Sequence, residues 1–151
     1  MKQIAWELEH SVEADVALSF AWTWRTDVTT WDDPPATFQL DGPFASGSRG
    51  ATLLPGQKPL RWEIRDVRPD RMFIIEMPLD GATLSFEWRF DAVSDRRTRI
   101  TQRIVLSGHN AAAYECDVRT SFESTLADGM KRIADAMARA DGTSGGGGNR
   151  R

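Results

Sequence analysis

Cysteine and histidine are scarce in this chain of 151 residues. The single cysteine, Cys116, cannot form a disulfide within the chain, which points to a reducing compartment or to no redox role at all. His10 and His109 are the only histidines, and no cysteine or histidine cluster has the spacing of metal ligands. We therefore expect neither a metal site nor a cofactor.

Long apolar runs and a strong net charge are also missing. No stretch approaches the roughly 18 apolar residues of a membrane span, and the first residues lack the apolar core of a signal peptide. The formal net charge is −3, and the arginines alternate with acidic residues instead of forming a basic stripe. We therefore expect a cytoplasmic protein that has neither nucleic acid nor a membrane as its partner.

Two common catalytic or nucleotide-binding motifs are absent. The glycine run at 145–148 does not lie between a strand and a helix, as a phosphate-binding loop would. No G-x-S-x-G sequence is present to hold a serine nucleophile. The motifs therefore assign no catalytic residue.

The clearest pattern that the chain does contain is a hairpin over residues 82–106. Apolar and polar side chains alternate along two runs that are joined by the charged turn at 95–97. Because side chains alternate faces along a strand, this hairpin has one apolar face and one charged face. The apolar face consists of Leu84, Phe86, Trp88, Phe90, Ile100, Gln102, Ile104 and Leu106, with Gln102 as its single polar member.

The remaining chain predicts further strands and a long C-terminal helix. Alternation and turn residues place strands near 3–12, 36–41, 48–54, 59–67 and 71–78, which makes about seven strands in all. A short helix follows Asp15, and a second helical turn at 31–33 ends at Pro34. An apolar stripe from Val118 to Ala140 predicts one helix that begins at Asn110 or Asp117 and ends at Gly142.

Four segments carry a resemblance to a known family. They are Trp31, the Leu40-Asp41-Gly42-Pro43-Phe44 segment followed by Gly47, the Val67-Arg68-Pro69-Asp70-Arg71 turn, and Thr98-Arg99-Ile100-Thr101. With the order of elements, they resemble the START/polyketide-cyclase (SRPBCC) superfamily over residues 3–140. The resemblance implies an α+β helix-grip fold, in which a curved antiparallel sheet of about seven strands wraps a long C-terminal helix and two short helices follow the first strand. Residues 1–141 would form this single domain, and 142–151 a disordered Gly/Ser/Arg tail.

A few polar residues and one glycine fall on the predicted inner face. His10 shares its strand face with Trp6, Leu8 and Val12, so it is either an acid/base group or a histidine satisfied by the backbone. Asp66 shares the parity of Trp62 but lies beside a turn and should reach solvent. On the helix stripe, Gly129 either packs closely on the sheet or leaves room for a ligand.

Members of the resembling superfamily bind lipids, sterols, polyketides or other bulky apolar molecules, and some cyclise or dehydrate polyketides. We interpret the chain as binding such a molecule in a cavity between the sheet and the C-terminal helix, as a monomer or homodimer. The expected ligand-binding residues are His10, Trp62, Phe73, Ile75, Phe86, Trp88, Gln102, Tyr114, Phe122 and Leu126. One alternative is a polyketide cyclase or dehydrase in which His10, Gln102 or Tyr114 acts on a carbonyl or a proton. A second is a co-chaperone-like protein-binding module, which needs an exposed apolar patch.

Overall fold

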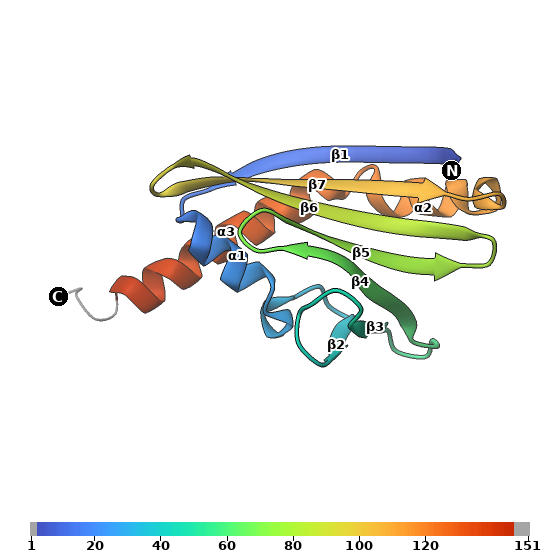
Figure 1. Ribbon diagram of the computed structural model, residues 1–151, viewed down its shortest axis with the longest axis horizontal. Helices are drawn as coiled ribbons and strands as arrows, with labels where there is room; N and C mark the ends of the chain where they lie inside the picture. The colour runs from blue at the N-terminus through green and yellow to red at the C-terminus, as the bar shows by residue number, and fades with distance from the viewer. Residues whose placement is uncertain (1–2, 147–151) are drawn as a thin grey trace.

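The chain folds around one antiparallel sheet. The structure, a computed structural model, describes residues 3–146 (Figure 1). Within that range seven strands pair in the order β1-β7-β6-β5-β4-β3-β2. The strands are β1 (Ile4–Ala14), β2 (Thr37–Asp41), β3 (Arg49–Leu53), β4 (Leu60–Arg68), β5 (Met72–Leu79), β6 (Ala82–Ser94) and β7 (Arg97–Ser107).

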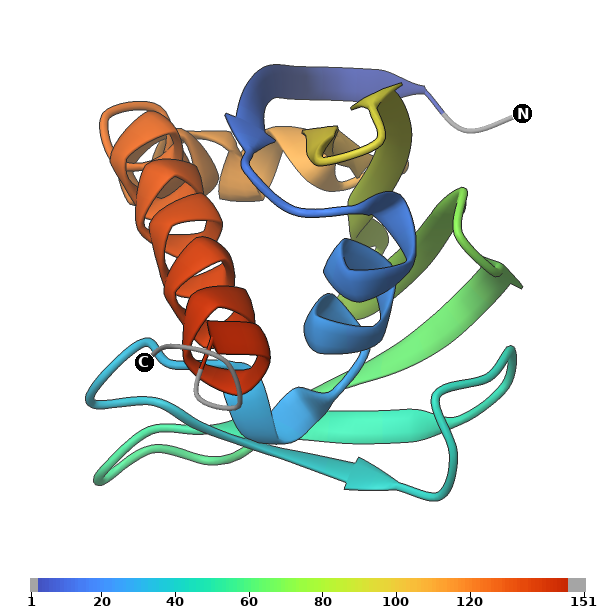
Figure 2. The same cartoon turned by 90° about the vertical axis from the view of Figure 1, so that its left-hand side faces the viewer.

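The helices lie inside the curl of this sheet. Helix α1 (Leu18–Arg25) and the 3-10 turn η1 (Val28–Thr30) follow β1, and η2 (Ala111–Tyr114), α2 (Glu115–Phe122) and α3 (Leu126–Gly146) follow β7. Figure 2 shows the sheet curving around α1 and α3. This arrangement confirms the predicted α+β helix-grip architecture.

The single long C-terminal helix of the prediction is wrong in one respect, because it is broken at residues 123–125. The Thr125 hydroxyl donates a hydrogen bond to the Ser121 carbonyl at 2.7 Å, and the Thr125 N–H donates to the Phe122 carbonyl three residues back. Serine and threonine side chains compete in this way with regular helical hydrogen bonds. The break lets α2 and α3 run in different directions.

The far end of α3 also differs from the expectation. Gly142 does not adopt a left-handed backbone, and the helix continues through Gly146. Of the tail predicted at 142–151, residues 147–151 lie outside the described residues, so the domain boundary at 141 stays a prediction.

The strand faces follow the predicted alternation. Trp6, Trp62 and Trp88 are buried on the inner face of the sheet, while Arg89 and Arg103 lie on the opposite, charged face. On that charged face arginines pair with glutamates of β1, as in Arg103–Glu7, Arg89–Glu9 and Arg99–Glu13. Exposed pairs of this kind contribute little to stability, and burial of the apolar face holds the sheet to its helices.

Asp66 departs from the parity that we used to place it. A β-bulge between Ile64 and Asp66 shifts the register of β4, so that Val67 pairs with the buried Phe73. Asp66 therefore leaves the inner face and forms an ion pair with Arg68 at 3.5 Å. This agrees with the expectation that its carboxylate reaches solvent.

Candidate functional site

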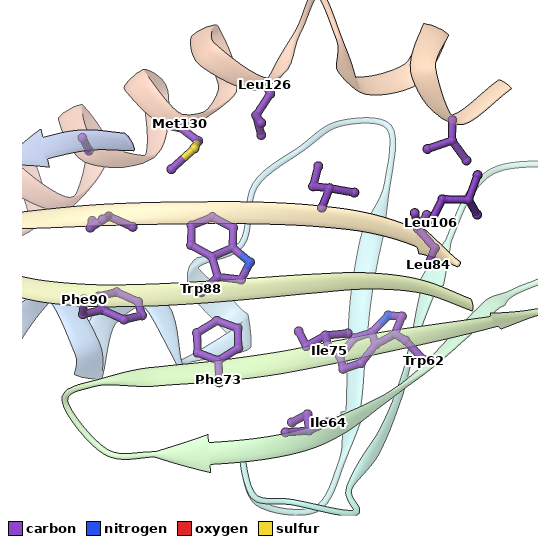
Figure 3. Packing of buried hydrophobic residues seen from close by; sticks show 14 of the residues in the cluster. Trp62, Ile64, Phe73, Ile75, Leu84, Trp88, Phe90, Leu106, Leu126 and Met130 are labelled. Atoms are coloured by element: carbon purple, nitrogen blue, oxygen red, sulfur yellow. The ribbon is translucent and has the colours of Figure 1, made fainter. Parts of the chain in front are cut away.

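A cavity of about 790 Å³ lies between the inner face of the sheet and the helices. Strands β2 to β7 form its floor, the end of α1 and the segment around η1 close one side, and α2 and α3 form the opposite wall. Its apolar walls include Trp31, Phe38, Trp62, Ile75, Met77, Phe86, Trp88, Phe122, Leu126, Met130 and Ile133. In Figure 3, Leu126 and Met130 point from α3 toward the sheet side chains Trp88 and Ile75.

Strand pairing arranges part of the floor as a row across the sheet. His10 of β1 is paired with Gln102 of β7, Gln102 with Trp88 of β6, and Trp88 with Phe73 of β5. Directly paired residues project to the same face, so these four side chains lie side by side, in the order given, across four neighbouring strands. Only Gln102 and Trp88, in the middle of the row, line the cavity.

The ten residues expected to bind a ligand divide into two groups. Seven of them line the cavity: Trp62, Ile75, Phe86, Trp88, Gln102, Phe122 and Leu126. The other three, His10, Phe73 and Tyr114, are absent from its lining. Phe73 is completely buried beneath Trp88 and Phe44, His10 lies partly buried on the edge strand β1, and the Tyr114 hydroxyl donates to the Asp80 carbonyl.

Sequence reasoning missed Arg25, the last residue of α1. Its guanidinium carbon lies 4.8 Å from the ring centre of Trp31 and 4.2 Å from that of Trp88, so two indole rings pack against the cation. The Trp31 indole N–H donates to the Arg25 carbonyl at 2.8 Å, which fixes that ring against the end of α1. Arg25 lines the cavity, where a charged side chain meets aromatic walls.

Arg25 has no charged partner in the described part of the chain. Its Nε is buried without a hydrogen-bond partner, and no carboxylate of residues 3–146 forms an ion pair with it. Burial lowers the pKa of Arg25 from its ordinary value to about 9, because the charged form loses its hydration. The guanidinium therefore stays protonated at neutral pH.

Solved structures share this architecture at low sequence identity. The truncated norcoclaurine synthase from Thalictrum flavum matches with a TM-score of 0.69 and 13% identity, over 92% of this chain and 94% of that chain. The same synthase in complex with dopamine and hydroxybenzaldehyde matches with a TM-score of 0.62 and 13% identity, over 92% and 87%. The Zhui aromatase/cyclase from a Streptomyces species matches with a TM-score of 0.65 and 15% identity, over 92% and 95%.

The seven-stranded order, the enclosed helices and these matches together decide the fold. The chain has the helix-grip fold. No protein-family model and no curated protein matches the sequence.

Two glycines shape the helix-grip cavity. A β-carbon on Gly50 of β3 would lie 2.3 Å from the ring of Trp62, so only glycine lets that indole lie flat across the strand. A β-carbon on Gly129 of α3 would meet nothing closer than the Arg132 guanidinium at 3.8 Å. Of the two explanations offered for Gly129, close packing on the sheet is therefore wrong, and the residue leaves open space beside the cavity.

The rim of the helix-grip cavity is charged, with acidic groups in excess. Asp32, Asp33, Asp128 and Asp135 are exposed lining residues, as are Arg132 and Arg139. Across residues 3–146 no three His, Cys, Asp or Glu side chains gather closely enough to hold a metal ion. None of the described helices has the length and apolar character needed to cross a bilayer.

Proposed function

We propose that this helix-grip protein binds a bulky, largely apolar small molecule in the cavity between the sheet and α3. The observation that carries the proposal is the cavity itself, about 790 Å³ of space with walls of tryptophan, phenylalanine, isoleucine and methionine. That volume falls in the range of small-molecule sites, which are mostly apolar with a few placed polar groups. Among the polar lining residues, Arg25 and Gln102 are the two that lie directly beside the indole of Trp88.

The structural neighbours support a ligand with aromatic character. The norcoclaurine synthase holds dopamine and hydroxybenzaldehyde, and the Zhui protein is an aromatase/cyclase. At 12–15% identity such neighbours share the fold, and function must be argued from the site. In this chain the cavity is lined by the indole rings of Trp31, Trp62 and Trp88, and these rings offer flat surfaces on which an aromatic ligand can stack.

Binding is better supported than a cyclase-type reaction. A cyclase would use His10, Gln102 or Tyr114 to polarise a carbonyl or move a proton, and of these only Gln102 lines the cavity. An amide can orient a carbonyl group, but it is not an acid or a base in water. The described lining therefore offers its apolar interior no histidine or tyrosine for proton transfer.

A co-chaperone-like role has less support still. The large apolar side chains exposed among residues 3–146 are Ile4, Leu60 and Val93, which lie on three different strands. No two of them are paired in register, so they do not form the contiguous patch that a partner surface needs.

Filling the cavity from α3 tests the proposal. Ala136 lines the cavity and Ala127 on the same helix is exposed and does not, so Ala136→Trp and Ala127→Trp make a matched pair. Binding of a neutral aromatic probe, anthracene-2-carboxamide, is measured by quenching of tryptophan emission and by calorimetry. We expect Ala136→Trp to weaken binding by at least about 10-fold, which is about 1.4 kcal/mol, and Ala127→Trp to change it by less than about 2-fold.

Circular dichroism confirms that both variants fold. Equal affinity of the two variants and the original chain would place the ligand elsewhere, and absence of binding to the folded original chain would refute a cavity for apolar molecules of this kind.

A further inference from the structure

Arg25 is the feature of the cavity that binding of an apolar molecule leaves unexplained. An apolar ligand gains nothing from a guanidinium, and a buried charge without a partner opposes folding. The chain supplies carboxylates to many of its exposed arginines, including Arg65, Arg97, Arg99 and Arg103. The one arginine whose Nε is buried without a partner receives none.

Two indole rings pack against the guanidinium of Arg25, and none of its N–H donors forms a hydrogen bond or ion pair with the described residues. The ring centres of Trp31 and Trp88 lie 4.8 and 4.2 Å from its central carbon, within the range of cation–π contacts. The N–H donors of a guanidinium lie in its plane and point outward from its edges, so stacking leaves them unoccupied. Two parallel N–H donors match the two oxygens of a carboxylate.

A second donor lies beside the same ring. Gln102 is directly paired with Trp88, it is 8% exposed, and it lines the cavity. Its amide forms no hydrogen bond that would commit it to another of the residues from 3 to 146. Arg25 therefore lies over the face of the Trp88 ring, and Gln102 lies beside it on the neighbouring strand. Both side chains can donate hydrogen bonds to one polar group of a ligand bound next to Trp88.

We propose that the ligand is an aromatic or polycyclic monoacid whose carboxylate is bound by Arg25, with Gln102 as a second donor and the apolar body stacked along Trp62, Ile75 and Phe86. This inference rests on the proposed function and narrows its ligand class. A single internal cation suits a single negative charge. The acidic excess at the rim, Asp32, Asp33, Asp128 and Asp135 against Arg132 and Arg139, disfavours multiply charged anions such as nucleotides.

The test compares two probes that share one ring system. Anthracene-2-carboxylate and anthracene-2-carboxamide have nearly the same shape and differ in charge, and both are titrated at pH 7 in about 0.15 M salt, where long-range steering is screened. We expect the original chain to bind the carboxylate at least about 10-fold more tightly than the amide.

Variants at Arg25 then test whether this side chain causes the preference for the carboxylate over the amide. Arg25→Met and Arg25→Gln should reduce the ratio of carboxylate to amide affinity to about 1, while the affinity for the amide changes by less than about 3-fold. Arg25→Lys should keep part of the preference, because it retains the charge but not the planar pair of donors. Arg71→Met, which removes an exposed arginine outside the cavity lining, is the charge-matched control and should keep the full preference.

The outcomes separate the two levels of the argument. If the original chain binds neither probe, the proposed function fails. Equal binding of both probes would leave the proposed function standing and overturn the anion site. A preference that survives Arg25→Met but disappears in Arg132→Met or Arg139→Met would move the anion to the rim, which also overturns the assignment to Arg25.

Discussion

The charge of Arg25 has opposite effects on folding and on the proposed ligand binding. Its charge is costly to bury, and the contacts with Trp31 and Trp88 return only part of that cost, since a cation over an aromatic ring contributes about 0.5–2 kcal/mol. Residues that bind ligands are often held in arrangements that are unfavourable in the free protein. Arg25 has this property, whereas the exposed ion pairs of the sheet do not.

Replacing Arg25 by methionine should therefore stabilise the ligand-free chain. A side chain of similar length without a charge fills the same space beside the indole rings and removes an unsatisfied donor, so we expect the free energy of unfolding to rise by about 1–3 kcal/mol. Urea denaturation followed by tryptophan fluorescence measures the change. A loss of stability of similar size would mean that Arg25 is a structural clamp for the two indoles.

The advantage of Arg25→Met should shrink at high pH. Burial holds the folded-state pKa of Arg25 at about 9, well below its ordinary value, so between these two pH values the unfolded chain binds more protons than the folded chain. The stability of the original chain relative to the variant therefore rises with pH above about 9. Asp32, Asp33, Asp128, Asp135, Arg132 and Arg139, which also line the cavity, are present in both proteins, so their titration largely cancels. Denaturation at pH 7 and pH 10.5 checks this, and an unchanged difference would contradict it.

Gln102 offers a milder test at the same scale. Gln102→Leu removes an uncommitted amide from the inner face, so folding stability should change by less than about 1.5 kcal/mol, the scale of one hydrogen bond. The binding free energy of anthracene-2-carboxylate should weaken by up to about 1.5 kcal/mol, since the carboxylate loses one of its two hydrogen-bond donors in the protein. Calorimetry of Gln102→Leu and of the exposed control Gln39→Leu on β2 measures both effects, and equal affinity of the two variants would remove Gln102 from the site.

At this scale alternation predicted much of the site. Trp62, Phe86 and Trp88 could be placed because the face of a strand residue follows from its own parity. His10 also has the predicted parity but lies outside the cavity lining, since the distance of β1 from the cavity depends on where the helices lie. Arg25 was missed although it follows Ala21 and Trp22 at helical spacing, because arginine is normally assigned to solvent and Trp31 buries it from outside the helix.

Strands and helices differ in how well their ends were predicted. The strand bounds agree within about two residues with the alternating segments, because turns at Gly42, Pro69 and Asp95 mark them in the sequence. The break between α2 and α3 was not predicted, since the apolar stripe continues through it. That break depends on the hydroxyl of Thr125, and apolar periodicity does not report it.

Two glycines on facing elements should respond oppositely to alanine. Gly50→Ala places a β-carbon 2.3 Å from Trp62, and the displaced indole should cost about 1–3 kcal/mol and narrow the cavity. Gly129→Ala meets no atom closer than 3.8 Å and should stabilise α3 by about 0.5–1 kcal/mol. Thermal unfolding of both variants measures the signs. A stabilised Gly50→Ala variant or a destabilised Gly129→Ala variant would contradict the space that the structure gives to each β-carbon.

In the whole molecule the sheet curves around α3 (Figure 2), and a cavity of about 790 Å³ lies between them. The overall form of the molecule was predictable because five of the six strand pairings join strands that are consecutive in sequence, which is a local arrangement. The volume of the cavity was not, since it is the small difference between the curl of the sheet and the side chains that project into it.

A ligand that binds in the cavity should contact both the sheet and the helices and so stabilise the folded state. Binding to the folded state alone raises stability with ligand concentration, by about 2.7 kcal/mol at 100 times the dissociation constant. We expect the thermal midpoint to rise with anthracene-2-carboxylate concentration in the original chain and in Arg71→Met. In Arg25→Met the rise should be much smaller, and an equal rise in all three would contradict an internal anion site.

The pairing of β1 with β7 determines when this protein can be completed during translation. Ser11 and Thr101 share a hydrogen bond of 2.7 Å across 90 positions of sequence. At about 5–20 residues per second, the first strand leaves the ribosome roughly 5–20 s before its neighbour is synthesised. Throughout that interval the apolar side of β1, with Trp6, has no sheet to join. We therefore expect nascent chains that stop at residue 96 to remain protease-sensitive on stalled ribosomes, and protection to appear only in chains from which residues 97–107 have emerged.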